Sequence, residues 1–116
     1  MSDAAPSPYY QAEDLKQFSQ IGRHAKALAD DFFRYYANAT AADGALSKRE
    51  KALIALAVSH AQKCPYCIDA YTTQCLEAGA NPEQMMEAVH VAAAMQAGIT
   101  LVHSVQMQNH LNKLVL

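Results

Sequence analysis

Residues 47–67 read SKREKALIALAVSHAQKCPYC, and the expected fold follows from this stretch. It opens with Ser47 and Glu50 at the spacing of a capping box, in which two side chains satisfy free backbone N–H groups at a helix start. Residues 52–58 are apolar on every side of that helix, which is typical of a helix buried in a core or between subunits. The stretch therefore predicts a buried helix that leads into a closely spaced pair of cysteines.

Helix signals continue on both sides of this stretch. Pro65 stops the first helix and suits the first position of the next, so Cys64 is expected to cap a helix that runs from Pro65 to about Ala78. Upstream, apolar residues at steps of three and four predict one long amphipathic helix over about 12–38. The members of its predicted apolar face are Leu15, Phe18, Ile21, Ala25, Leu28, Phe32 and Tyr35.

Downstream, Asn81 and Pro82 indicate another helix start. Gly98 is expected to mark a break in that helix or a close contact between helices, before a last helix that ends near Leu114. The fold class is therefore all-α, with a flexible arm over residues 1–10, where two prolines oppose regular structure, and a single helical domain over residues 11–116.

Composition limits the partners. The 116 residues are 52% hydrophobic and 17% charged, which is more apolar material than one small chain easily buries, so we expect subunit interfaces. A net charge of −2 provides no basic surface for nucleic acid or an anionic membrane. No uninterrupted apolar run is long enough for a membrane span, and no signal-peptide pattern opens the chain, so we expect a cytoplasmic protein.

The sharpest chemical feature is Cys64-Pro65-Tyr66-Cys67. Two thiols three residues apart at a helix start can form a disulfide, and the free N–H groups there favour a thiolate. This pattern predicts dithiol redox chemistry. Two alternatives stay open, namely a pair of buried cysteines and half of a zinc site that His60 and another histidine would complete.

Neighbouring side chains offer candidate roles. His60 precedes Cys64 by one helical turn and could exchange a proton with a thiol, or could simply bond a carbonyl at its helix end. Tyr71 follows Cys67 by four residues and could donate to sulfur or to a bound peroxide, or belong to the core. Glu50 is expected to serve the helix cap more than acid catalysis. The third cysteine, Cys75, is expected to be a core residue.

The stretches 48–58 and 64–67, followed by residues 87–95, resemble the carboxymuconolactone decarboxylase and alkyl hydroperoxidase D superfamily. A narrower resemblance, carried by residues 64–72 and 103–107, is to peroxidase-like proteins associated with arsenosugar biosynthesis.

The resemblance implies an alkyl hydroperoxidase D-like helical bundle that assembles as a homo-trimer or homo-hexamer, without metal or cofactor. It also implies reduction of a hydroperoxide, with electrons from a dihydrolipoamide-like or thioredoxin-like thiol donor. By the family pattern Cys67 attacks the peroxide and Cys64 resolves it as a disulfide, whereas position at the helix cap favours Cys64 as the attacking thiol. An alternative from a different class is a binding module in which the dithiol captures trivalent arsenic or zinc without turnover.

The sequence departs from the family's proton relay at two positions. The family's glutamate, twelve residues before the first cysteine, corresponds to Ala52, and its histidine, four residues after the second, corresponds to Tyr71. A general base contributes about 10²- to 10⁴-fold in rate, whereas an exposed helix terminus contributes less than about tenfold. We therefore expect His60, which precedes Cys64 by one helical turn, to replace the relay. The alternative is that peroxide turnover is slow and the dithiol serves another acceptor or ligand.

Overall fold

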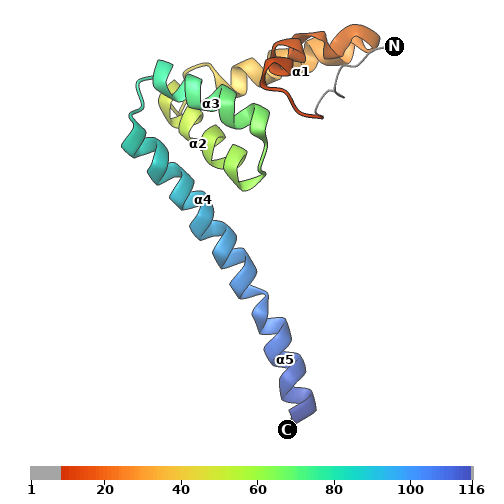
Figure 1. Ribbon diagram of the computed structural model, residues 1–116, viewed down its shortest axis with the longest axis vertical. Helices are drawn as coiled ribbons and strands as arrows, with labels where there is room; N and C mark the ends of the chain where they lie inside the picture. Colours follow the sequence, from red (N-terminus) through yellow and green to blue (C-terminus); the bar gives the residue numbers. More distant parts are fainter. Residues whose placement is uncertain (1–8, 116) are drawn as a thin grey trace, which may run out of the picture.

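The computed structural model describes residues 9–115, within which the chain forms one 3₁₀-helix, five α-helices and no strand (Figure 1). These elements are η1 (Ala12–His24), α1 (Lys26–Thr40), α2 (Lys48–Ala61), α3 (Pro65–Glu77), α4 (Pro82–Val102) and α5 (Ser104–Val115). The predicted all-α class is confirmed. Most of the predicted flexible arm, residues 1–8, lies outside the described residues.

The core lies where α2 packs against α3 on one side and the first half of α4 on the other (Figure 1). Its most buried members come from α2, α3 and the turn that follows α3, and they are Ala52, Leu56, Tyr71, Cys75 and Ala80. Cys75 has no exposed surface, so the prediction that it is a core residue is confirmed. Ser59 is also buried, and its hydroxyl donates to the Ala55 carbonyl at 2.6 Å.

The turn between α2 and α3 places the cysteine pair. The N–H of Cys64 donates to the Ser59 carbonyl at 3.0 Å, and the N–H of Lys63 donates to the His60 carbonyl at 3.1 Å. These two bonds form a Schellman motif, which needs a residue in the left-handed region at the position that Lys63 fills with φ 54°. The chain thus reverses within three residues, and Cys64 serves at once as the end of this motif and the cap of α3.

A second Schellman motif ends α3, and here a glycine fills the left-handed position. Gly79 adopts φ 90°, its N–H donates to the Leu76 carbonyl, and the N–H of Ala80 donates to the Cys75 carbonyl. The helix starts are as predicted from the sequence: capping boxes are complete at Ser47 and at Asn81.

The long helix predicted over 12–38 is wrong in two respects. Ala25, with φ −155° and ψ 61°, interrupts it, so η1 folds back along α1 and Phe18 stacks its ring against Phe33 and Tyr36. The predicted apolar face is also displaced. Tyr35 of that face is 72% exposed. The half-buried face of α1 is instead formed by Ala29, Phe33, Tyr36 and Thr40.

The physical reason is that α1 carries apolar residues on two faces, through the neighbouring pairs Phe32–Phe33 and Tyr35–Tyr36. The break at Ala25 uncouples the register of α1 from that of η1. Tertiary contacts then select which of the two faces packs.

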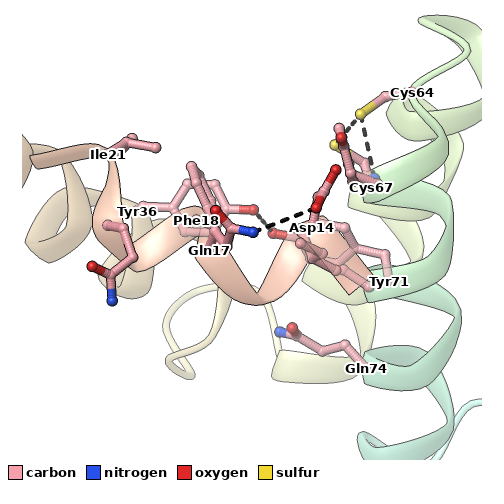
Figure 2. A pocket seen from close by; sticks show the side chains of 13 residues that line it. Asp14, Gln17, Phe18, Ile21, Tyr36, Cys64, Cys67, Tyr71 and Gln74 are labelled. Atoms are coloured by element: carbon pink, nitrogen blue, oxygen red, sulfur yellow. Dashed lines mark hydrogen bonds between the residues drawn. The ribbon is translucent and has the colours of Figure 1, made fainter. Parts of the chain in front are cut away.

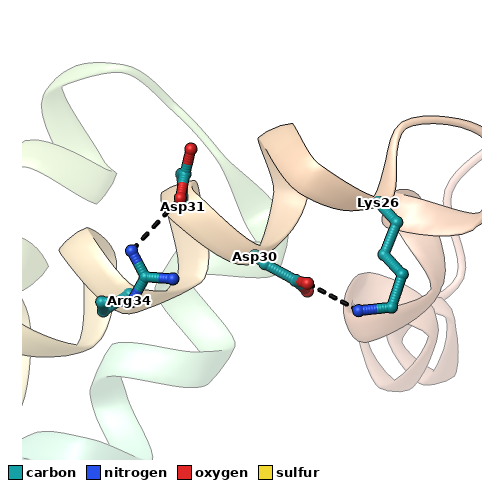
Figure 3. A network of polar contacts seen from close by, with 4 residues as sticks. All are labelled: Lys26, Asp30, Asp31 and Arg34. Carbon is teal, nitrogen blue, oxygen red and sulfur yellow. Dashed lines mark hydrogen bonds and ion pairs between the residues drawn. The ribbon is translucent and has the colours of Figure 1, made fainter.

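The solvent side of α1 carries two short-range ion pairs (Figure 3). Lys26 Nζ lies 2.6 Å from Asp30 Oδ2, and Arg34 Nη1 lies 3.2 Å from Asp31 Oδ1. All four side chains are more than half exposed, and such pairs contribute only about 0.2–0.5 kcal/mol each. They support the helix and do not mark a functional site.

The predicted break at Gly98 is also wrong. α4 runs through Gly98, because a lone glycine costs a helix only about 1 kcal/mol and no neighbouring atom within 4 Å needs the space of its missing Cβ. The interruption comes at His103, between α4 and α5. There the His103 ring nitrogen Nδ1 lies 2.7 Å from the Ile99 carbonyl oxygen, and the Ser104 hydroxyl donates to the Leu101 carbonyl.

The second half of α4 continues into α5 as a rod that extends away from the other helices (Figure 1). The radius of gyration is 19.9 Å, against about 13 Å expected for a compact chain of this length. By length and composition alone the segment Pro82–Leu114 could cross a membrane, although core helices of soluble proteins meet the same criterion. The sequence-based expectation that nothing spans a bilayer stays a prediction.

Candidate functional site

The two thiols of the motif lie together at the start of α3. Cys64 and Cys67 are both reduced and partly buried, and their Sγ atoms are 2.6 Å apart. The N–H of Cys67 donates to Cys64 Sγ at 3.3 Å, so the cap of α3 is the sulfur itself. A disulfide needs a sulfur separation of about 2.05 Å, and the pair therefore reaches it with a small movement.

A cleft of about 770 Å³ opens beside the thiols, between η1 and α3 (Figure 2). One wall comes from η1 and the other from α3, with Tyr36 of α1 at the base. Its lining combines apolar surface with amide and carboxylate groups: Asp14, Leu15, Gln17, Phe18, Gln20, Ile21, Tyr66, Ala70 and Gln74. A ligand far larger than hydrogen peroxide fits this space.

A second cleft of about 500 Å³ lies between α1, α2 and the same motif. Its lining is mostly apolar and includes Leu46, Ile54 and Val58. Four residues line both clefts, namely Tyr36, Cys64, Cys67 and Tyr71. The dithiol and the two tyrosines thus form a wall that separates two openings.

The electrostatics of Cys67 differ from the sequence-based expectation. Burial, the hydrogen bond with Cys64 and the electrostatic effect of the neighbouring Cys64 sulfur together raise the pKa of Cys67 to about 11. At Cys67 the helix start therefore does not produce the readily formed thiolate that was expected for the pair. A helix N-terminus contributes about 0.3–1 kcal/mol, which is less than one pKa unit, and burial outweighs it.

Tyr71 is buried, with 6% of its surface exposed, and its hydroxyl is hydrogen-bonded to the hydroxyl of Tyr36 (Figure 2). Burial, the bond to Tyr71 and the nearby thiols raise the pKa of Tyr36 well above its usual value. The sequence suggested two roles for Tyr71, a core residue or a residue of the site. The structure is compatible with both, because Tyr71 belongs to the core and also lines the cleft beside the thiols.

His60 and Glu50 have other partners. The ring nitrogen Nδ1 of His60 lies 2.9 Å from the Leu56 carbonyl oxygen, one turn back in α2, and His60 lines neither of the two clefts. The Glu50 carboxylate accepts from the N–H of Ser47 at 2.8 Å, and this bond lowers the pKa of Glu50. Glu50 thus completes the helix cap, as the sequence analysis favoured.

The last residues before η1 lie against α3. The Tyr10 hydroxyl donates to Asp69 Oδ2 at 3.0 Å, and its ring centroid lies 4.6 Å from that of Tyr66. Tyr66 is the third residue of the cysteine motif and lines the cleft, so the segment that leads into η1 is anchored next to the site.

The sequence analysis missed the contribution of η1 and of Tyr36. Tyr36 is 35 residues away from Tyr71 in the chain, and no local spacing connects the two. The one available signal was the Tyr35–Tyr36 pair, whose second member continues the face of Ala29 and Phe33.

Comparison with known proteins agrees with this fold. The model of the carboxymuconolactone decarboxylase family matches residues 27–108. The chain belongs to this family.

The chain is 46% identical over 91 residues to a Paracoccus denitrificans protein called uncharacterized protein 4 in the cox locus. That match covers 77% of this chain and 82% of the relative. The structure is similar to a crystal structure of a carboxymuconolactone decarboxylase family protein from Legionella pneumophila, in its apo form. The TM-score is 0.63 at 29% identity, over 81% of this chain and 84% of the other.

The carboxymuconolactone decarboxylase fold shows where the two residues lie that differ from the expected relay. Ala52 is fully buried in the core, so no acid can act from that position. Tyr71, at the other position, lines the cleft. A subgroup within the family is not distinguished by these matches.

Proposed function

We propose that this carboxymuconolactone decarboxylase family protein is a thiol-dependent peroxidase or disulfide oxidoreductase that cycles Cys64 and Cys67 between dithiol and disulfide. The observation that supports this most directly is the sulfur separation of 2.6 Å at the edge of a 770 Å³ cleft. Such a pair gives two electrons to an oxidant without a resident cofactor, and a thiol donor restores it.

We assign Cys67 as the attacking thiol and Cys64 as the resolving thiol. The Cys67 thiolate attacks the outer oxygen of a hydroperoxide, the O–O bond breaks, and a sulfenic acid and an alkoxide form. Cys64 then attacks the Cys67 sulfur, and water leaves. Because the pKa of Cys67 is raised to about 11, few thiolates exist at neutral pH, and we expect slow turnover there.

The test is thiol titration before and after one equivalent of tert-butyl hydroperoxide, with mass spectrometry of the peptide that contains residues 64–67. The wild type should lose both thiols of this peptide and form an internal disulfide, and C75S should behave identically. C64S and C67S should form no internal disulfide. Unchanged thiols in the wild type would overturn the proposal.

The alternative proposal is capture of trivalent arsenic by the same dithiol without turnover. Thiolates suit soft ions, and two adjacent sulfurs can bind one. Zinc is less favoured, because within residues 9–115 no group of three or more His, Cys, Asp or Glu side chains is placed to hold a metal ion. Stoichiometric arsenite that blocks alkylation of both thiols, together with no disulfide after peroxide, would select this alternative.

We further propose that the protein self-associates, as a trimer or hexamer, through the rod of α4 and α5. Many large apolar side chains of the rod are at least 45% exposed: Met86, Val91, Met95, Ile99, Leu101, Val102, Val105, Met107, Leu111 and Leu114. A soluble monomer rarely leaves so much contiguous apolar surface in water. Light scattering that gives the mass of a single chain at micromolar concentration would refute this assembly.

A further inference from the structure

The hydroxyls of Tyr36 and Tyr71 form a pair, and both tyrosines share the lining of the two clefts with the thiols (Figure 2). Tyr36 reaches this point from α1 and Tyr71 from α3, so the pair depends on the packing of two separate helices. A tyrosine needed only for packing could bury its ring and be replaced by phenylalanine. Here both hydroxyls are kept together, on residues that line the same clefts as the reactive sulfurs.

Tyr36 can act as the donor of this pair. Burial and the bond to Tyr71 raise the pKa of Tyr36, so its hydroxyl keeps its proton. When Tyr36 donates its hydrogen bond to the Tyr71 oxygen, the Tyr71 proton is free to point into the cleft. The same bond then stabilises the Tyr71 phenolate once that proton has left.

We infer that Tyr71 is the acid that protonates the leaving alkoxide, and that Tyr36 is the positioning residue that aims it and stabilises its phenolate. This inference rests on the proposed peroxidase function and adds to it a proton route. Neither the acid nor the imidazole that the family resemblance implies is present at the corresponding positions, which hold Ala52 and Tyr71.

The step balances as follows. Cys67 loses a proton to solvent, its thiolate takes the outer oxygen of the hydroperoxide, and the alkoxide that leaves receives the Tyr71 proton. The Tyr71 phenolate then takes the proton of the Cys64 thiol. The resulting Cys64 thiolate attacks the Cys67 sulfenic acid, which gives the disulfide and a hydroxide that the first proton neutralises. Two thiols and one hydroperoxide thus become a disulfide, an alcohol and water.

The need for an acid depends on the leaving group. An alkoxide is about as basic as hydroxide, whose conjugate acid has a pKa of about 15.7. A peroxycarboxylic acid instead releases a carboxylate, whose conjugate acid has a pKa of about 4, and this group leaves without a proton. Comparison of the two oxidants therefore isolates the acid from any general effect on the thiols.

The experiment measures the rate of disulfide formation in Y36F with tert-butyl hydroperoxide and with peracetic acid. General acid catalysis raises a reaction rate by about 10²- to 10⁴-fold. Y36F keeps Tyr71 but removes the hydrogen bond that orients its hydroxyl. The rate with tert-butyl hydroperoxide should therefore fall by about tenfold or more. The rate with peracetic acid should stay within about twofold of the wild type. Y71F should show the same selectivity with a loss of about a hundredfold.

The matched control is Y35F, which removes a hydroxyl from the next residue of the same helix, where the side chain is 72% exposed. It should change neither rate. If Y36F and Y71F slow disulfide formation equally with both oxidants, the tyrosine pair has only a structural role. If neither variant changes either rate, the pair takes no part in the reaction. A wild type that forms no disulfide with either oxidant would refute the peroxidase function itself, which is a different outcome.

Discussion

Cys67 should react as a strongly basic thiol, and the consequence for its alkylation can be worked out. A pKa of about 11, against an ordinary value of 9.0, leaves about a hundredfold fewer thiolates at neutral pH. A more basic thiolate is also the better nucleophile, by about six- to tenfold over two pKa units. The two effects combine to make alkylation of Cys67 by iodoacetamide roughly tenfold slower at pH 7 than that of an ordinary exposed cysteine.

The sign of the pH dependence follows from the same values. Because the pKa is raised, the thiolate fraction should grow about tenfold per pH unit from pH 7 to about pH 10 and level off only above that. The assay is iodoacetamide labelling at fixed times, with the modified residue identified by mass spectrometry. A rate that levels off by pH 8 would refute the inference that burial and the neighbouring thiol control Cys67.

C64A gives an internal check on the cause. Two of the three influences that raise the pKa of Cys67 come from Cys64, through its hydrogen bond and its electrostatic effect, and this variant removes both. The pKa should fall toward the ordinary value, and labelling at pH 7 should become faster than in the wild type. An unchanged or slower rate in C64A would show that burial alone sets the pKa.

Further predictions concern stability and access. L56A should lower the free energy of unfolding by about 2–5 kcal/mol, measured by denaturant titration, because Leu56 is 2% exposed at the centre of the core. N81A should lower it by about 1 kcal/mol through loss of the α4 cap, with no change in peroxide reactivity. K63G should raise it by about 0.5–1 kcal/mol, because glycine suits the left-handed position, and a loss of stability would contradict that reading of the turn. Cys75, with no exposed surface, should stay unlabelled in the native protein and react only after denaturation.

The parts of the fold that local chemistry specifies could be predicted from the sequence. A hydroxyl and a carboxylate three residues apart defined the start of α2, and a proline after a cysteine defined the start of α3. The site could be predicted as far as it is local, since Cys64 and Cys67 share one helical turn.

The remainder depends on contacts between distant segments, which spacing does not encode. Apolar residues at neighbouring positions gave α1 two possible faces, and only packing against η1 and α2, with the bond to Tyr71, selects the one that carries Tyr36. Gly98 looked like a break because glycine weakens helices. However, the side-chain bonds at His103 and Ser104 interrupt the rod instead.

The four residues shared by both clefts have a kinetic consequence. The dithiol can be reached from the η1 side and from the α2 side, so a bulky oxidant held in the larger opening leaves the sulfurs accessible through the smaller one. Some enzymes bind oxidant and reductant in turn through one opening. In these enzymes each substrate, at high concentration, blocks the binding of the other. A thiol donor that approaches Cys64 and Cys67 from the α2 side would not compete in this way, and excess hydroperoxide would not slow the return of the reduced protein.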